Sequence, residues 1–235
     1  MDSNLPRVLM LILSSDTNPI YIKFQEIWRT IMNSHPNIDC YFYKGNSSQE
    51  EEYRMIDKNT LSIRIDDGCS MIYEKMRMAF SFFKNDLHKY DFVCRPNISS
   101  FIAFDNYLKT LSSIQSQKET KTKFCYASIF HYGDLQFASG AAFTISTDIV
   151  EYIINTPRPK YIEDDVTVGL YLREMGVVIT PALAGSINTE QDAEILNRID
   201  IHKTDLFHFR LKTYGNREKD LEHFKRLIEI YYLKK

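Results

Sequence analysis

The sequence predicts an α/β fold in which a mostly parallel central sheet is flanked by helices. Short apolar segments of strand length alternate with segments of helical spacing along the chain. No internal repeat, low-complexity tract or linker interrupts this alternation, so we expect one domain, residues 1–235. With 44% hydrophobic and 26% charged residues, the chain can bury a full core.

The expected strands are short apolar runs bounded by turn residues. They lie at 7–14, 38–43, 61–65, 90–94, 124–130 and 141–145. The strand at 90–94 should stop before Pro96, because proline supplies no donor to a sheet. The acidic stretch 49–52 is expected to be a solvated loop or a helix start, and 115–123 a polar loop.

The expected helices repeat apolar residues every three or four positions. They lie at 19–33, 70–84 and 104–114, then from Thr147, from Asp164, and over 217–233. Ligands of open α/β sheets bind beyond the carboxyl ends of the strands. We therefore expect Ser14, Ser15, residues 95–97 and the loop before Asp164 to meet at one site.

Bulk properties exclude several classes of protein. The net charge of -2 lacks the basic excess of a nucleic-acid-binding protein, so no nucleic-acid partner is expected. Four scattered cysteines without a CxxC pair indicate reduced thiols. The apolar run 8–13 is too short to span a bilayer, so no transmembrane segment is expected. These features favour a cytoplasmic protein.

The most informative segments are 137–146 and 161–170. In the first, Ser139 and Gly140 form a small-residue segment where backbone can approach a ligand. In the second, Asp164 and Asp165 open a helix. The helix amino end keeps such a carboxylate ionised while its neighbour raises its proton affinity, which suits a general base. The alternative is that one of the pair is an N-cap.

Cations gather near the carboxyl end. An extended backbone over 206–213 places His208, Arg210 and Lys212 on one face, where they could grip phosphates, with Arg217 following. A solvent-exposed edge strand is the alternative interpretation.

Three further candidates come from the amino-terminal half. Ser14 and Ser15 end a strand and either meet a nucleotide or are turn residues. Lys75 lies on a helix that could face the same site, although a lone lysine is more often solvated.

The order of these segments resembles the fringe and β1,3-galactosyltransferase superfamily. Residues 164–169, DDVTVG, match its DDVxxG pattern at every fixed position, and Ser139, Gly140 and Ala141 match its SG(G/A) segment. The resemblance implies a GT-A (Rossmann-like) glycosyltransferase with a nucleotide-sugar donor, UDP-linked, and Asp165 as the base of an inverting transfer. Asp164 is the fallback for that role.

The resemblance also implies where the donor binds. In the superfamily the strand corresponding to 90–94 ends in acids that hold a divalent metal; here Arg95 matches the cation, while Asn97 and Ser99 stand in place of the acids. Neutral oxygen donors cannot neutralise a cation, so firm binding of Mn²⁺ or Mg²⁺ is not expected; weak binding stays open. Around Asp67 and Lys75 only a few superfamily positions correspond.

A related group of bacterial and viral transferases bears RTNxSSF at this strand, and residues 95–101 match it except at Pro96. A cytoplasmic enzyme of microbial or viral type is therefore expected, in the host-cell cytoplasm if viral. The expected acceptor is a glycan or glycosylated molecule. The alternative is a non-catalytic nucleotide- or glycan-binding protein on a degenerate transferase fold. A nucleotidyltransferase would be expected to have a glycine-rich phosphate-binding loop after the first strand, and residues 14–17 contain no glycine.

Overall fold

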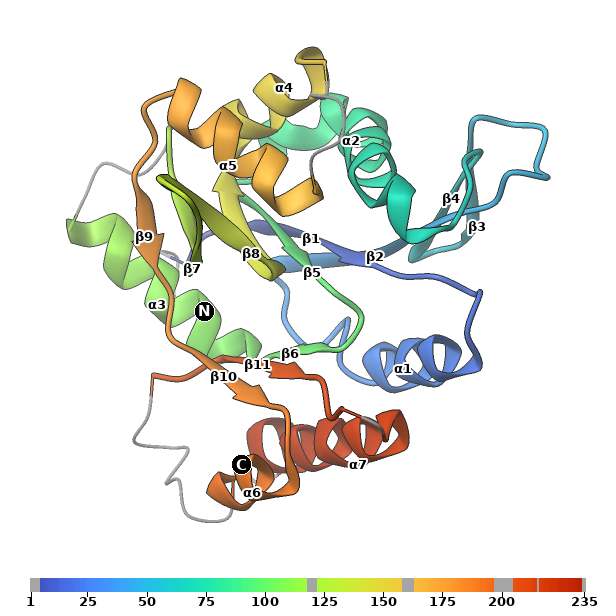
Figure 1. Ribbon diagram of the computed structural model, residues 1–235, viewed down its shortest axis with the longest axis vertical. Helices are drawn as coiled ribbons and strands as arrows, with labels where there is room; N and C mark the ends of the chain where they lie inside the picture. The colour runs from blue at the N-terminus through green and yellow to red at the C-terminus, as the bar shows by residue number, and fades with distance from the viewer. Residues whose placement is uncertain (1–4, 118–121, 158–162, 197–204, 215, 234–235) are drawn as a thin grey trace.

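A computed structural model describes residues 5–117, 122–157, 163–196, 205–214 and 216–233. Its central feature is an eight-stranded sheet in the order β3-β4-β2-β1-β5-β8-β7-β9 (Figure 1). In chain order these strands are β1 (Val8–Leu13), β2 (Ile38–Gly45), β3 (Tyr53–Asp57), β4 (Thr60–Ile63), β5 (Phe92–Pro96), β7 (Cys125–Tyr132), β8 (Leu135–Ser146) and β9 (Ile179–Pro181).

The parallel part of the sheet comprises β4, β2, β1 and β5, each parallel to its neighbour. β8 runs antiparallel to both β5 and β7. It follows β7 in a hairpin that turns at Gly133 (φ 56°). β9 returns parallel to β7. The α/β class is confirmed, with a parallel block extended by a hairpin.

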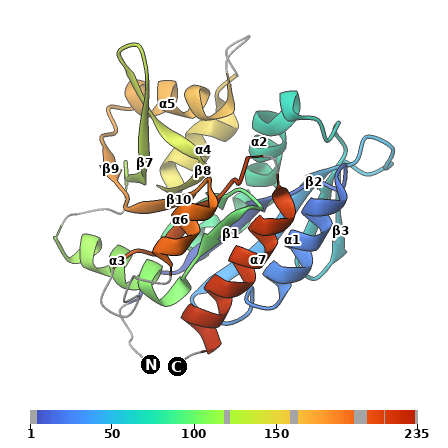
Figure 2. The ribbon, with the colours of Figure 1, turned by 60° about the horizontal axis from the view of Figure 1, so that its bottom comes forward.

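Helices cover both faces of the sheet (Figures 1 and 2). They are α1 (Pro19–Arg29), α2 (Ile72–Phe82), α3 (Phe104–Gln117), α4 (Thr147–Asn155), α5 (Asp164–Glu174), α6 (Glu190–Ile195) and α7 (Arg217–Ile228). α2, α4 and α5 pack on one face, and α1 and α7 on the other. No helix within the described ranges has the length and apolar character needed to cross a membrane.

The apolar run of β1 is explained by its central position. Met10 and Ile12 belong to the core on the α1 and α7 face, whereas Leu9 and Leu11 belong to the core under α2 and α4. A strand buried on both faces needs apolar side chains at every position. Three of the four free cysteines, at 40, 94 and 125, are buried in these cores, and Cys69 is exposed.

Several predicted boundaries are wrong. β3 was not predicted, because its side chains are largely exposed at the edge of the sheet and carry no apolar alternation. β5 continues through Arg95 to Pro96, which pairs with Ala142 of β8 and not with β1. β8 begins at Leu135, six residues before the expected start, because the hairpin pairs it with β7.

The helices differ less from expectation. α1 ends at Arg29 instead of residue 33, and α3 reaches Gln117 instead of residue 114. The last helix becomes a π-helical turn over Glu229–Leu233. Part of the expected polar loop, residues 118–121, lies outside the described residues.

A second, three-stranded sheet places the carboxyl-terminal cations. β6 (Ser100–Ile102) pairs antiparallel with β11 (His208–Leu211), which pairs parallel with β10 (Ala184–Ile187). Arg210 lies opposite Ser100 in this register. β6 follows β5 after three residues, so the register brings β11 beside the carboxyl end of the central sheet.

Candidate active site

Two adjoining cavities lie beyond the carboxyl ends of β1 and β5. The larger has a volume of about 500 Å³ and the smaller, the carboxylate cavity, about 280 Å³. Both are lined by Ile72, Asn97 and Arg210, so the two cavities share a wall. Clefts at this position are where open α/β sheets bind their ligands.

Arg95 organises the carboxylate cavity. Its side chain is only 1% exposed. The Nη2 atom lies 3.2 Å from Oδ2 of Asp164, and Nη1 donates to the carbonyl of Gly140 at 2.5 Å. Nε donates to the hydroxyl of Tyr43 at 3.1 Å and Nη1 to Oδ1 of Asn97 at 3.2 Å. A buried guanidinium is stable only when a carboxylate balances its charge and its N–H groups have acceptors.

Asp165 has no cation within ion-pair distance among the described residues. Its Oδ2 accepts the backbone N–H of Gly140 at 3.2 Å, and Oδ1 accepts that of Val166 at 2.9 Å. Burial, and then the charge of Asp164, raise the pKa of Asp165 above its ordinary value, opposed by the two N–H groups and Arg95. A fixed carboxylate with increased proton affinity is suited to remove a proton.

A side chain at Gly140 would crowd this carboxylate where β8 meets it. A Cβ on Gly140 would lie 3.0 Å from Oδ2 of Asp165 and 3.5 Å from its Cβ and Cγ. The N-cap of α5 is Glu163, and Asp164 and Asp165 stand in the first turn. The alternative that one aspartate is only the N-cap is therefore wrong.

One wall of the large cavity is built around Asp67. Oδ1 of Asp67 accepts from the backbone of Gly45 at 2.9 Å and from Lys75 Nζ at 2.8 Å; Oδ2 accepts from Ser15 Oγ at 2.6 Å and from the backbone of Asp16 at 3.2 Å. Lys75 is 2% exposed, so it is not the solvated lysine of the alternative interpretation. Through these hydrogen bonds Asp67 connects β2 with α2 and with the loop that follows β1.

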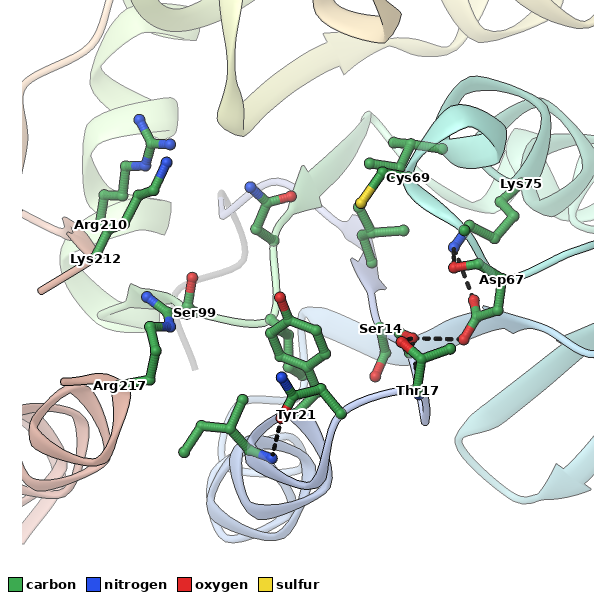
Figure 3. A pocket seen from close by; sticks show the side chains of 18 of the residues that line it. Ser14, Thr17, Tyr21, Asp67, Cys69, Lys75, Ser99, Arg210, Lys212 and Arg217 are labelled. Atoms are coloured by element: carbon green, nitrogen blue, oxygen red, sulfur yellow. Dashed lines mark hydrogen bonds and ion pairs between the residues drawn. The ribbon is translucent and has the colours of Figure 1, made fainter. Parts of the chain in front are cut away.

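The opposite wall carries the cations, as Figure 3 shows. Arg210, Lys212 and Arg217 line this side of the large cavity. Arg217 is ion-paired with buried Asp220 at 2.5 Å. Within the described part of the chain no carboxylate pairs with Arg210 or Lys212, so two positive charges face the cavity without a counter-ion.

Two buried hydroxyls also line the large cavity. Ser14 Oγ and Thr213 Oγ1 have no hydrogen-bond partner among the described residues. Buried hydroxyls are normally hydrogen-bonded, so these two are exceptions at the cavity wall.

His208 lines neither cavity. It is buried at the start of β11, and burial, followed by the charge of Arg210, lowers the pKa of its imidazole to about 4. The expected third cation on this edge is therefore wrong: the side chain is neutral at physiological pH. The strand is also not the solvent-exposed edge of the alternative, because β11 lies between β10 and β6.

Asn97 and Ser99 connect the two sheets. Asn97 bridges to Leu13 of β1, and the carbonyl of Ser99 accepts the N–H of Leu211 at 3.0 Å. They lead into β6. This donor set does not fit the divalent metal of the resembled superfamily, because Asn97 and Ser99 carry no negative charge and the Arg95 guanidinium lies 3.2 Å from Oδ1 of Asn97.

Four lining or supporting residues were not singled out from the sequence. Tyr21 and Thr213 line the large cavity, Phe137 lines the carboxylate cavity, and Tyr43 holds Arg95. Tyr43 and Phe137 fit an apolar core pattern equally well, so the sequence gives no signal for them. Thr213 adjoins the predicted Lys212, which is the one hint available.

No family model and no curated protein matches this chain. Among solved structures, it is similar to a glycosyltransferase involved in the glycosylation of the major capsid of PBCV-1, at 11% identity and a TM-score of 0.52, over 94% of this chain and 100% of the other. A197 from STIV aligns at 11% identity and a TM-score of 0.41, over 75% of this chain and 81% of the other. The first likeness shows that the chain has the fold of that glycosyltransferase.

Proposed function

We propose that this protein is a glycosyltransferase that moves a sugar from a nucleotide-sugar donor, UDP-linked, to an acceptor hydroxyl with inversion. The observation that carries the proposal is the shared wall of the two cavities, at which Asn97 and Arg210 face both. A donor that spans this wall has its diphosphate among cations and its sugar beside carboxylates. The fold shared with the PBCV-1 glycosyltransferase supports the assignment.

The nucleotide is assigned to the large cavity. Arg210 and Lys212 have no counter-ion among described residues and suit a diphosphate, whose oxygens arginine binds in pairs. The buried hydroxyls of Ser14 and Thr213 lack partners among the described residues, and a small shift of the wall would let the ribose or base supply them. The same two cations would stabilise the negative charge that develops on the departing diphosphate, which is usually a large part of catalysis.

The acceptor hydroxyl is assigned to the carboxylate cavity. Asp165 is placed there by two backbone N–H groups and has a raised pKa. As the acceptor oxygen attacks the anomeric carbon, its proton passes to Asp165 while the bond from that carbon to the diphosphate breaks. Proton transfer to a positioned base contributes about 10²- to 10⁴-fold to such a rate.

Calorimetric titration of UDP, GDP and UDP-sugars, first in EDTA and then in excess Mn²⁺, tests donor binding. We expect UDP to bind in EDTA and Arg210→Gln to weaken it by about tenfold, the scale of one charge-assisted hydrogen bond. Arg54→Gln is the matched control, because Arg54 is exposed on β3 and distant from both cavities. Binding only with Mn²⁺, or equal binding by Arg210→Gln, would contradict this assignment.

A non-catalytic nucleotide-binding protein is the second candidate. It is favoured by the neutral residues Asn97 and Ser99, which replace the metal-binding acids of the resembled superfamily. UDP-sugars that bind in EDTA but are neither hydrolysed nor transferred to any acceptor would identify this function.

A further inference from the structure

The lining of the carboxylate cavity includes two aromatic residues of the β7–β8 hairpin. Phe130 of β7 and Phe137 of β8 are directly paired across the hairpin and line the cavity together. Their ring centroids lie 6.1 Å apart at 31°. The backbone of Phe137 is fixed against α5, since a Cβ on Gly169 would lie 3.0 Å from the Cα of Phe137.

These rings extend to the surface. Phe130 is 49% exposed, and Tyr132, two residues along β7 and therefore on the same face of the strand, is 73% exposed. Exposed aromatic side chains that continue from the lining of a cavity onto the protein surface are typical of a binding surface.

The lining of the carboxylate cavity thus combines apolar and polar groups. Besides the two rings it includes Asp164, Asp165 and Gly140. A pyranose has matching chemistry: its C–H groups form apolar faces that pack on aromatic rings, and its hydroxyls at the rim donate to carboxylates. A lipid chain would leave the carboxylates without donors, and a serine side chain would leave the rings uncovered.

From this geometry we infer that Phe130, Phe137 and Tyr132 form the acceptor subsite, and that the acceptor is a sugar ring of a glycan stacked on Phe130 with one hydroxyl at Asp165. The acceptor role rests on the proposed glycosyltransferase function; the sugar-binding surface itself does not. The volume of about 280 Å³ is near the lower limit of ligand cavities, which suits one ring at a time.

Saturation-transfer NMR tests the subsite without turnover. The probes are methyl β-glucoside, methyl β-galactoside and methyl α-rhamnoside, each with UDP present, and irradiation of the protein aromatic protons. At least one glycoside should receive saturation at its ring C–H protons. Phe130→Leu should reduce that signal about fivefold, the scale of one aromatic stacking contact, and Phe130→Trp should retain it. Phe82→Leu is the matched control, because Phe82 is a partly exposed phenylalanine of α2 that lines neither cavity.

The outcomes separate the two proposals. No signal from any glycoside, an unchanged signal in Phe130→Leu, or stronger transfer to the peptide Gly-Gly-Ser-Gly-Gly would overturn the sugar subsite. Titration of UDP into the same variants reports on the donor site alone. A glycoside signal that depends on Phe130 in a protein that binds no UDP would support the sugar subsite and contradict the proposed transferase.

Discussion

Nη2 of Arg95 lies 3.2 Å from Oδ2 of Asp164, whereas the adjacent Asp165 is held by backbone N–H groups alone. Two neighbouring carboxylates therefore stand in different environments. The first neutralises a buried cation, and the second keeps a raised pKa. This difference in environment indicates a structural role for Asp164 and a chemical role for Asp165.

Substitution of the two aspartates should change stability to different extents. The pKa of Asp165 is raised in the folded state, so this group stabilises folding most below its unfolded pKa and loses that contribution as pH rises through the folded pKa. Asp165→Asn removes the unfavourable charge at pH 7 but leaves one of the two backbone N–H groups without an acceptor, so it should change the free energy of unfolding little. Asp164→Asn should lower it by about 3 kcal/mol, because Arg95 loses its counter-ion.

Urea denaturation of both variants between pH 4 and 8 measures their free energies of unfolding. Two variants that destabilise equally at pH 7 would contradict the separate environments of the two carboxylates.

Replacing Arg95 should affect both folding and the pH dependence of activity. Arg95→Gln removes the positive charge that lowers the pKa of Asp165, so that pKa should rise further. The acidic limb of the pH–kcat profile should move to higher pH, and stability should fall by about 3 kcal/mol. Arg95→Lys keeps the charge and should leave the limb closer to its wild-type position. An identical profile in wild type and Arg95→Gln would argue against electrostatic coupling between Arg95 and Asp165.

Two glycines should respond differently to alanine. In Gly140→Ala the new methyl group presses on the Asp165 carboxylate at 3.0 Å, so kcat should fall by about 10- to 100-fold with little change in stability. In Gly169→Ala the methyl group meets the backbone of the hairpin, 3.0 Å from Cα of Phe137 and 3.1 Å from the carbonyl of Gln136. That variant should lose about 1–3 kcal/mol of stability. Thermal melts combined with initial rates distinguish the two; wild-type activity in Gly140→Ala would refute a close Gly140–Asp165 contact.

The sequence predicted well those elements whose local pattern has one structural explanation. The continuous apolar run of β1 required burial on both faces. The small residues Ser139 and Gly140 were expected to let backbone approach a ligand; in the structure the group that approaches Gly140 is the Asp165 carboxylate, and the approach of a ligand stays a prediction. β3 escaped prediction because exposed polar residues at a sheet edge leave no periodic signal.

The candidate site depends on pairings that no local pattern encodes. Alternation predicted that His208 and Arg210 share one face of β11, but it does not predict how deeply each side chain is buried. Burial makes His208 neutral, whereas Arg210 lines both cavities. Likewise, Arg95 was singled out, yet its contact with Asp164 joins residues 69 positions apart, through the pairing of β5 with β8 and the packing of α5 on β8.

The most direct test of the central claim is single-turnover sugar transfer by Asp165→Asn, measured beside its affinity for UDP, with Asp148→Asn on α4 as a matched control distant from both cavities. If Asp165 is the base, the variant should bind UDP with wild-type affinity and transfer sugar at least about 100-fold more slowly, while the control keeps wild-type transfer. Transfer by Asp165→Asn at the wild-type rate would contradict the account.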